Sequence, residues 1–170
     1  MVLNGITPQT VSFADPTYSL LNYLDVQNTS DEVVTFIPSL SAKEIVTEGV
    51  TLPGLQITHR DYLLTHDMNI EGDLIVSGKV KHSGGTVDLT GGTLLVGESY
   101  WQAGGALEID GGLLDITNDY LVRNVSEDVE TGVLSFGFSS GQLIMQSASD
   151  RIVVGGDFVM DSNRRHDGYL

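Results

Sequence analysis

The sequence contains no cysteine, and it has few basic residues, few prolines and a single tryptophan. The absence of cysteine excludes disulfides, thiolate metal sites and cysteine nucleophiles. Only 8 Lys and Arg residues stand against 23 Asp and Glu, which gives the 170-residue chain a formal net charge of -15 and a pI near 4.2. This acidity argues against nucleic acid as a partner, because phosphate binding needs a basic surface.

Long apolar segments are also missing. No run of 18 or more apolar residues is present to span a membrane, and the N-terminal MVLNGITPQT has neither the basic nor the apolar region of a secretion signal. The chain is nevertheless 41% hydrophobic, with a mean hydropathy of +0.05, which suits one domain with a continuous core. Glycine is abundant at 20 residues, without the period of collagen.

The middle of the chain matches itself at a shift of 20 residues. Three segments align without a gap: EGDLIVSGKV (71–80), GGTLLVGESY (91–100) and GGLLDITNDY (111–120). A fourth copy, DRIVVGGDFVM (150–160), follows after a longer step, which predicts an insertion of about 16 residues within 123–140.

Apolar and polar residues alternate inside each copy, as at Leu74 and Val76 or at Leu94 and Val96. Alternation with a period of two indicates half-buried strands, and the Gly-Gly, Asp-Gly and Ser-Gly pairs between the runs indicate tight corners. The predicted fold is therefore all-β, a single-stranded parallel β-helix (β-solenoid) with about 20 residues per coil. A sandwich or barrel is disfavoured because nothing in those folds requires one repeated spacing.

The regularity of the repeat divides the chain into two parts. Residues 66–170 are predicted to form the regular solenoid, with the insertion near 123–140. Residues 1–65 are less periodic, and we expect irregular coils or an N-terminal cap of the same solenoid, with a separate helical cap as the alternative.

Stacking of the coils would align equivalent residues in columns. Three inward columns are expected: Leu74, Leu94, Leu114 and Ile152; Val76, Val96, Ile116 and Val154; and Val80, Tyr100, Tyr120 and Phe158. The third column is interpreted as an aromatic core ladder with offset stacking, and a sugar-binding strip is the alternative. Trp101 falls on the outward phase, so it is the predicted surface contact.

Acidic residues form the candidate metal site. Asp88 and Glu108 would lie on successive coils about 5 Å apart, and Asp110 is close in sequence. We favour a solvated acidic face; calcium binding and a glycosidase-type carboxylate pair stay open as alternatives.

No other pattern indicates chemistry. The histidines His59, His66, His82 and His166 are too scattered for a zinc motif. The column of Lys79, Ser99, Asp119 and Asp157 suggests pairing at the surface. No catalytic residue, and no cofactor other than the candidate calcium, is predicted.

Two stretches resemble a known group of proteins: NIEGDLIVSGKVKHSGGTVDLTGGTLLVGESYWQ (69–102) and GQLIMQSASDRIVVGGDFVMDSNRRHDGYL (141–170). They are similar to the β-solenoid repeat region of long, mostly uncharacterised clostridial and other Gram-positive cell-surface proteins. The similarity covers residues 62–170 and, more weakly, NYLDVQNTSDEVVTF from Asn22. It implies an extracellular, stalk-like or fibrous role and carries no catalytic residues. In those proteins the repeat continues after GYL, which implies a fragment or one protomer of a longer assembly.

These observations lead to a functional hypothesis. We expect a non-enzymatic structural module: a rigid extracellular rod, stalk or fibre-forming segment of a bacterial surface protein. The alternative is a carbohydrate-binding or carbohydrate-active β-helix protein. The expected partner is a copy of the chain, or the continuing polypeptide, at the C-terminal end; a surface polysaccharide or host ligand is a further candidate. Membrane insertion is not expected.

Overall fold

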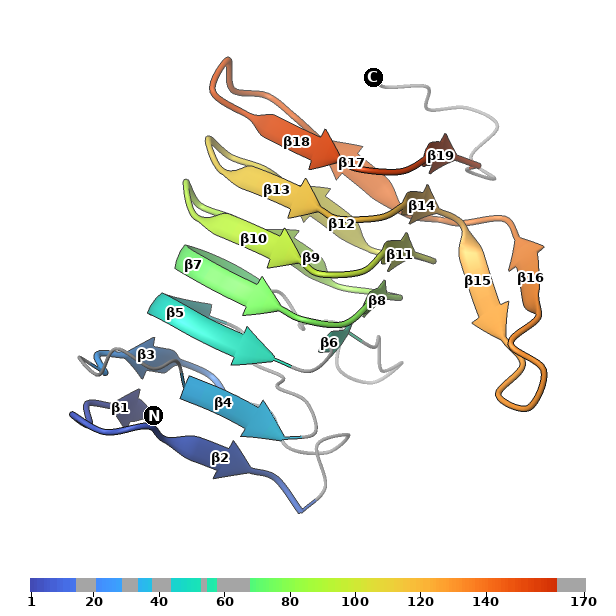
Figure 1. Cartoon of the computed structure of the whole chain (residues 1–170). Helices are drawn as coiled ribbons and strands as arrows, with labels where there is room; N and C mark the ends of the chain where they lie inside the picture. Colours follow the sequence, from blue (N-terminus) through green and yellow to red (C-terminus); the bar gives the residue numbers. More distant parts are fainter. Residues whose placement is uncertain (15–20, 29–33, 38–43, 53–54, 58–67, 162–170) are drawn as a thin grey trace.

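The computed structural model describes residues 1–14, 21–28, 34–37, 44–52, 55–57 and 68–161 (Figure 1). These residues form strands and no helix, so none of them belongs to a helix able to cross a membrane. The predicted all-β character is confirmed. The strands are β1 (Val2–Leu3), β2 (Thr10–Ser12), β3 (Leu24–Val26), β4 (Val34–Ile37), β5 (Glu44–Leu52), β6 (Leu55–Ile57), β7 (Met68–Val76), β8 (Val80–His82), β9 (Thr86–Asp88), β10 (Thr93–Val96), β11 (Tyr100–Gln102), β12 (Ala106–Glu108), β13 (Leu113–Ile116), β14 (Tyr120–Val122), β15 (Asn124–Glu127), β16 (Leu134–Gly137), β17 (Gln142–Ile144), β18 (Arg151–Val154) and β19 (Phe158–Met160).

Parallel pairing dominates the sheet topology. The larger sheet follows the order β1-β3-β5-β7-β10-β13-β18, and β2, β4, β9, β12 and β17 join it off this path. A second sheet runs β19-β14-β11-β8-β6. We call the strands that lie at one level a layer; β9–β11, β12–β14 and β17–β19 are successive layers, and the last of these is the terminal layer.

The 20-residue shift in the sequence reappears as strand register. Leu94 pairs with Leu74 on one side and with Leu114 on the other, and Leu114 pairs with Ile152. The column that contains Tyr100 is in register in the same way. The three predicted columns are therefore correct.

The corners of the layers use left-handed backbone. Thr90 (φ 44°) and Gly91 (φ 76°) turn one layer, and Asp110 (φ 39°) and Gly111 (φ 81°) turn the next. Two consecutive positive φ values define a type I′ turn, which explains why a glycine follows each of these residues. Hydrogen bonds close both turns, with Gly92 N–H donating to the Leu89 carbonyl at 2.6 Å and an equivalent bond of 2.7 Å in the next layer.

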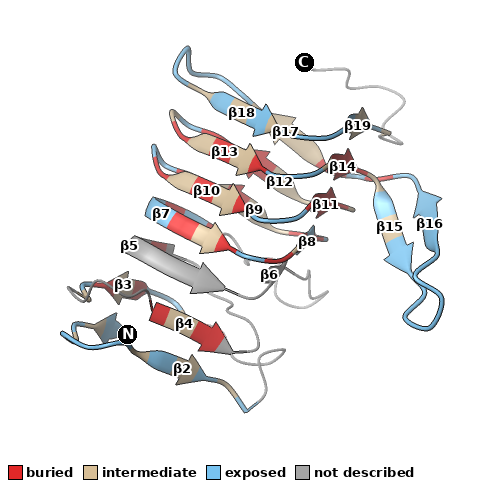
Figure 2. Cartoon of the chain, viewed as in Figure 1, coloured by how far each residue is buried: buried red, intermediate tan, exposed pale blue. Residues whose placement is uncertain are grey.

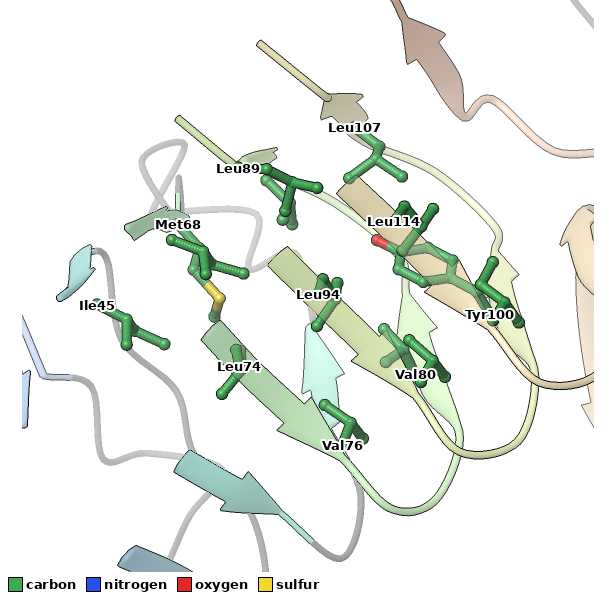
Figure 3. Close-up of a cluster of buried hydrophobic side chains, with 14 of the residues drawn as sticks. Ile45, Met68, Leu74, Val76, Val80, Leu89, Leu94, Tyr100, Leu107 and Leu114 are labelled. Atoms are coloured by element: carbon green, nitrogen blue, oxygen red, sulfur yellow. The ribbon is translucent and has the colours of Figure 1, made fainter. Parts of the chain in front are cut away.

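The core lies between the two parallel sheets. Figure 3 shows Leu74, Leu94 and Leu114 on successive strands, with Val76 and Val80 in the neighbouring positions, and all five side chains are buried. Full burial of one such side chain contributes about 1.5–3 kcal/mol. Repetition of the columns therefore supplies a continuous apolar core through the stack.

The aromatic column belongs to this core, but its rings are not offset-stacked. Tyr100 and Tyr120 meet at a centroid distance of 5.3 Å and an interplanar angle of 75°, and Tyr120 and Phe158 meet at 5.1 Å and 65°. Both are edge-to-face contacts, an arrangement that brings the positive ring edge to the negative ring face. Offset stacking, as expected from the sequence, is wrong because the two tyrosine rings, Tyr100 and Tyr120, must also direct their hydroxyls at polar partners, described below.

The segment expected to hold the insertion forms an antiparallel hairpin of β15 and β16, beside the smaller sheet (Figure 1). Most of its residues are exposed (Figure 2). At the N-terminal side, for which a separate helical cap over residues 1–65 was the alternative, the described residues form β1 to β6. Residues 15–20, 29–33, 38–43, 53–54 and 58–65 of this part lie outside the described residues. Residues 162–170 also lie outside them.

Candidate functional site

The acidic residues considered as calcium ligands lie at a corner. Asp88 and Glu108 are in register on β9 and β12, as expected. One Asp88 carboxylate oxygen accepts a hydrogen bond from Thr90 N–H at 2.8 Å, and Asp110 occupies the left-handed position of the next turn. Both aspartates therefore have a conformational role in the corners. Within the described ranges, no group of three or more His, Asp or Glu side chains lies close enough to hold a metal ion.

Trp101 is not a surface residue. Its side chain is only 5% exposed, although it lies on the outward phase of β11 and outside the main core cluster. The Nζ atoms of Lys79 and Lys81 lie 4.5 and 5.2 Å from the ring centroid, and β15 contacts β11. The predicted surface contact is therefore wrong: the alternation identified the face of the strand but not the hairpin and lysines that cover it.

Polar contacts hold the hairpin against this outer face. Lys79 forms an ion pair of 3.0 Å with Glu127 at the end of β15. At the base of the hairpin, Arg123 pairs with Asp161 at 3.1 Å and lies over the ring of Phe136 at 5.2 Å. Both ion pairs are about one-third exposed, so each stabilises the hairpin only modestly, by about 0–1 kcal/mol.

Two buried hydrogen bonds repeat from layer to layer. The Tyr100 hydroxyl lies 3.0 Å from Nδ1 of His82, and the Tyr120 hydroxyl donates to the Gln102 side-chain oxygen at 2.7 Å. The two residues of each pair are 18 positions apart, and all four side chains are buried. Each tyrosine thus reaches back to the polar residue two places along the strand in the preceding layer.

Hydrogen bonding defines the state of the His82 ring. Nε2 lies 3.2 Å from the Gly85 carbonyl, which can only accept, so Nε2 donates and Nδ1 accepts from Tyr100. Burial lowers the pKa of His82 to about 4, and the contact with Gly85 opposes this shift. Burial also raises the pKa values of Tyr100 and Tyr120. Both pairs are therefore uncharged near pH 7, and their side chains are hydrogen-bonded to each other. The shifted pKa values of His82, Tyr100 and Tyr120 do not favour proton transfer by these side chains near pH 7.

A second repeated contact involves the column that begins at Lys79. Ser99 Oγ accepts the N–H of Asp119 at 3.4 Å, and Asp119 Oδ1 accepts the N–H of Asp157 at 2.8 Å. Each side chain thus accepts the amide of the equivalent residue in the next layer. Surface pairing, as the sequence suggested for these positions, occurs at Lys79, whose partner Glu127 lies outside the column. At Ser99 and Asp119 a ladder of side-chain-to-backbone bonds takes its place.

The terminal layer is where these repeated contacts stop. Phe158 is 48% exposed, whereas the preceding ring of the column, Tyr120, is fully buried. Figure 2 shows the same change from buried to exposed between β13 and β18. We take the open side of this layer as the candidate functional site. Of the histidines, His59, His66 and His166 lie outside the described residues.

Sequence reasoning missed the tyrosine pairs and the amide ladder. The signal for the pairs was available: a tyrosine recurs 18 residues after a polar residue that stands at an inward position of its strand, where alternation predicts an apolar side chain. Comparisons with family models, curated proteins and solved structures found no match to this chain.

Proposed function

We propose that this chain is a non-catalytic structural module, a β-solenoid segment of a rigid rod, stalk or fibre at the bacterial cell surface. The single observation that carries the proposal is the recurrence of the same columns, 20 residues apart, in strands that pair in parallel. Such a repeat adds length without changing the cross-section. Each added layer extends the stack by about 4.8 Å.

Three further properties support a rod. Parallel ladders of backbone hydrogen bonds run along the stack, so bending would strain many bonds together. The net charge of -15 keeps neighbouring rods apart and soluble. The open terminal layer offers a place for end-to-end contact with a copy of the chain or with continuing polypeptide. The surface location rests on the resemblance of residues 62–170 to cell-surface repeats.

The carbohydrate-binding alternative has less support. It relied on Trp101 as an outward aromatic platform and on the aromatic column as a sugar-binding strip. Two lysines cover the Trp101 ring, and Tyr100 and Tyr120 of the column are fully buried. Sugar stacking requires an accessible ring face, which Trp101 does not offer.

Duplication of one layer tests the proposal. A second copy of residues 84–103 would be inserted directly after Ala103, and the matched control would insert the same 20 residues in scrambled order. We expect the duplicated chain to gain about 5 Å in maximum dimension by small-angle scattering, with an unchanged cross-section and a larger urea m-value. The scrambled insertion should add a disordered loop without raising the m-value. A duplicated chain that behaves like the scrambled one would contradict the proposal.

A further inference from the structure

Each strand of the terminal layer has one edge that is not paired with another described strand. Within the part of the chain that the structure describes, β17 pairs only with β12, β18 only with β13, and β19 only with β14. Every one of these strands therefore presents one row of backbone groups that has no strand partner among the described residues. Open parallel edges of this kind are templates for strand addition.

The amide ladder ends on an acceptor. Ser99 and Asp119 each accept the N–H of the following layer, and Asp157 is the next residue in this series. Asp157 is exposed, and its carboxylate has no hydrogen-bond partner in the part of the chain that the structure describes. A further layer would place a backbone N–H above it, which is the contact that both preceding layers make.

The tyrosine pairs define which side chain can follow. Tyr100 and Tyr120 need acceptors in the preceding layer, and His82 and Gln102 provide them. Where the acceptor position is Val122, the next ring is Phe158, which has no hydroxyl. Hydroxyl and acceptor are thus present together or absent together.

Applied to the terminal layer, this rule specifies the next ring position. The acceptor position that corresponds to His82, Gln102 and Val122 is Met160, whose thioether is a poor acceptor. A tyrosine above Phe158 would bury its hydroxyl against Met160 without a good partner. A hydroxyl-free apolar side chain, such as phenylalanine, would continue the column without this cost.

We propose that the open side of β17, β18 and β19 docks one further β-layer of the same 20-residue pattern, with a hydroxyl-free apolar residue above Phe158 and a backbone N–H above Asp157. Four observations converge on this occupant: strand edges and an Asp157 carboxylate that lack partners among the described residues, the exposed ring of Phe158 and the apolar Met160. The inference rests on the proposed function and adds the chemistry that selects the segment.

Peptide binding to the full chain provides the test. The probe is a labelled peptide that copies residues 84–102, in its natural form and with the Tyr100→Phe change. This layer is chosen because it carries two acidic residues, Asp88 and Glu98, and the layer copied from 104–122 would carry four. We expect saturable binding by fluorescence polarisation, about tenfold tighter for the Phe peptide than for the Tyr peptide.

Two variants of the chain sharpen the test. Met160→Gln restores an acceptor like that of Gln102, so the preference for the Phe peptide should disappear or reverse. Asp157→Ala removes the acceptor for the docked amide and should weaken both peptides by the same factor, about fivefold. The matched control is Val129→Gln at the hairpin tip, another exposed apolar residue changed to glutamine, which should change neither affinity.

Two results would overturn the inference: no saturable binding of either peptide, or a Phe-to-Tyr ratio that Met160→Gln leaves unchanged. Either result is compatible with a layer duplication that lengthens the particle. In that case the proposed rod function would be retained and only the docking inference would be rejected. Conversely, selective peptide binding with a failed duplication would retain the docking surface and reject the rod. Dimers of the free chain that the Phe peptide does not dissociate would place the contact elsewhere and also count against the inference.

Discussion

Layer β12–β14 and the terminal layer β17–β19 have nearly the same sequence pattern but differ in burial. Leu114, Ile116 and Tyr120 are buried, whereas their register partners Ile152 and Val154 are only partly buried and Phe158 is 48% exposed. The inward phase is therefore a property of the sequence, but burial is a property of the neighbouring layer. One layer alone cannot cover its own apolar face, which is why a repeat of this kind depends on stacking.

The largest expected effect comes from introducing a charge into one column, either in an inner layer or in the terminal layer. Leu94→Asp would put a carboxylate between Leu74 and Leu114, in a buried site with no partner for the charge. We expect a loss of about 4 kcal/mol or more in the free energy of unfolding. Ile152→Asp, in the same column of the terminal layer, should cost only about 1–2 kcal/mol because water reaches this position. Urea unfolding curves of both variants measure these losses in the free energy of unfolding.

Leu95→Asp is the control for the register itself, because Leu95 points to the opposite face of β10 and is only partly buried. We expect it to unfold close to the midpoint of the unchanged chain. If Leu94→Asp and Leu95→Asp lost the same stability, the assigned inward phase would be incorrect.

The second prediction concerns His82, which the interior of the stack holds in its neutral form. The folded pKa is about 4 and the unfolded value is near 6.5, so the unfolded state binds more protons between these values. The contribution of His82 to the free energy of unfolding is therefore fully present above pH 6.5 and decreases as the pH drops towards 4. We expect the free energy of unfolding to fall by about 2 kcal/mol at pH 5 and by about 3 kcal/mol below pH 4. Unfolding curves between pH 4 and 7.5 report it.

His82→Gln is the matched control, because Gln102 makes the equivalent contacts one layer later. The side-chain Nε2 of Gln102 donates to the Gly105 and Gln142 carbonyls, and its side-chain oxygen accepts from the Tyr120 hydroxyl. The variant should keep most of its stability at pH 7 and lose the His82 share of the pH dependence. An unchanged pH profile would show that other groups cause the acid sensitivity.

The sequence predicted the columns and the parallel all-β fold, because these follow from alternation and from one repeated spacing. It could not predict that Trp101 is covered, since the hairpin of residues 124–137 has no counterpart in the repeat and reaches back over β11. The edge-to-face rings were missed for a different reason. Their orientation depends on hydroxyl partners in another layer, and alternation within one strand carries no information about such contacts.

The third prediction breaks the correlation between hydroxyl and acceptor inside the stack. Tyr120→Phe leaves the Gln102 side-chain oxygen without its buried donor, and Gln102→Val leaves the Tyr120 hydroxyl without its acceptor. Each single change should cost about 1–3 kcal/mol. The double variant recreates the natural pair of Val122 and Phe158 and should be more stable than the two single losses predict, by about 1 kcal/mol. Strict additivity in this cycle would reject the pairing rule.

The smallest expected effect concerns the corners, where the layers differ again. In the terminal layer the corner is longer, and Asp150 accepts N–H bonds from Gly111 at 2.6 Å and from Ser147 at 2.9 Å. In the layer of β9–β11 the corner instead forces Thr90 to a φ of 44°, which is unfavourable for a β-branched side chain.

Asparagine tolerates left-handed backbone, so Thr90→Asn should stabilise the chain by about 0.5–1 kcal/mol. Aspartate, which the next layer uses as Asp110, is a poorer choice because it adds a further charge beside Asp88. The control is Thr93→Asn, which removes a β-branched residue from strand β10, where it suits the extended backbone, and should lower stability slightly. Thermal midpoints of the two variants should therefore move in opposite directions. A midpoint of Thr90→Asn at or below that of the unchanged chain would mean that the strain at Thr90 contributes nothing measurable to the corner.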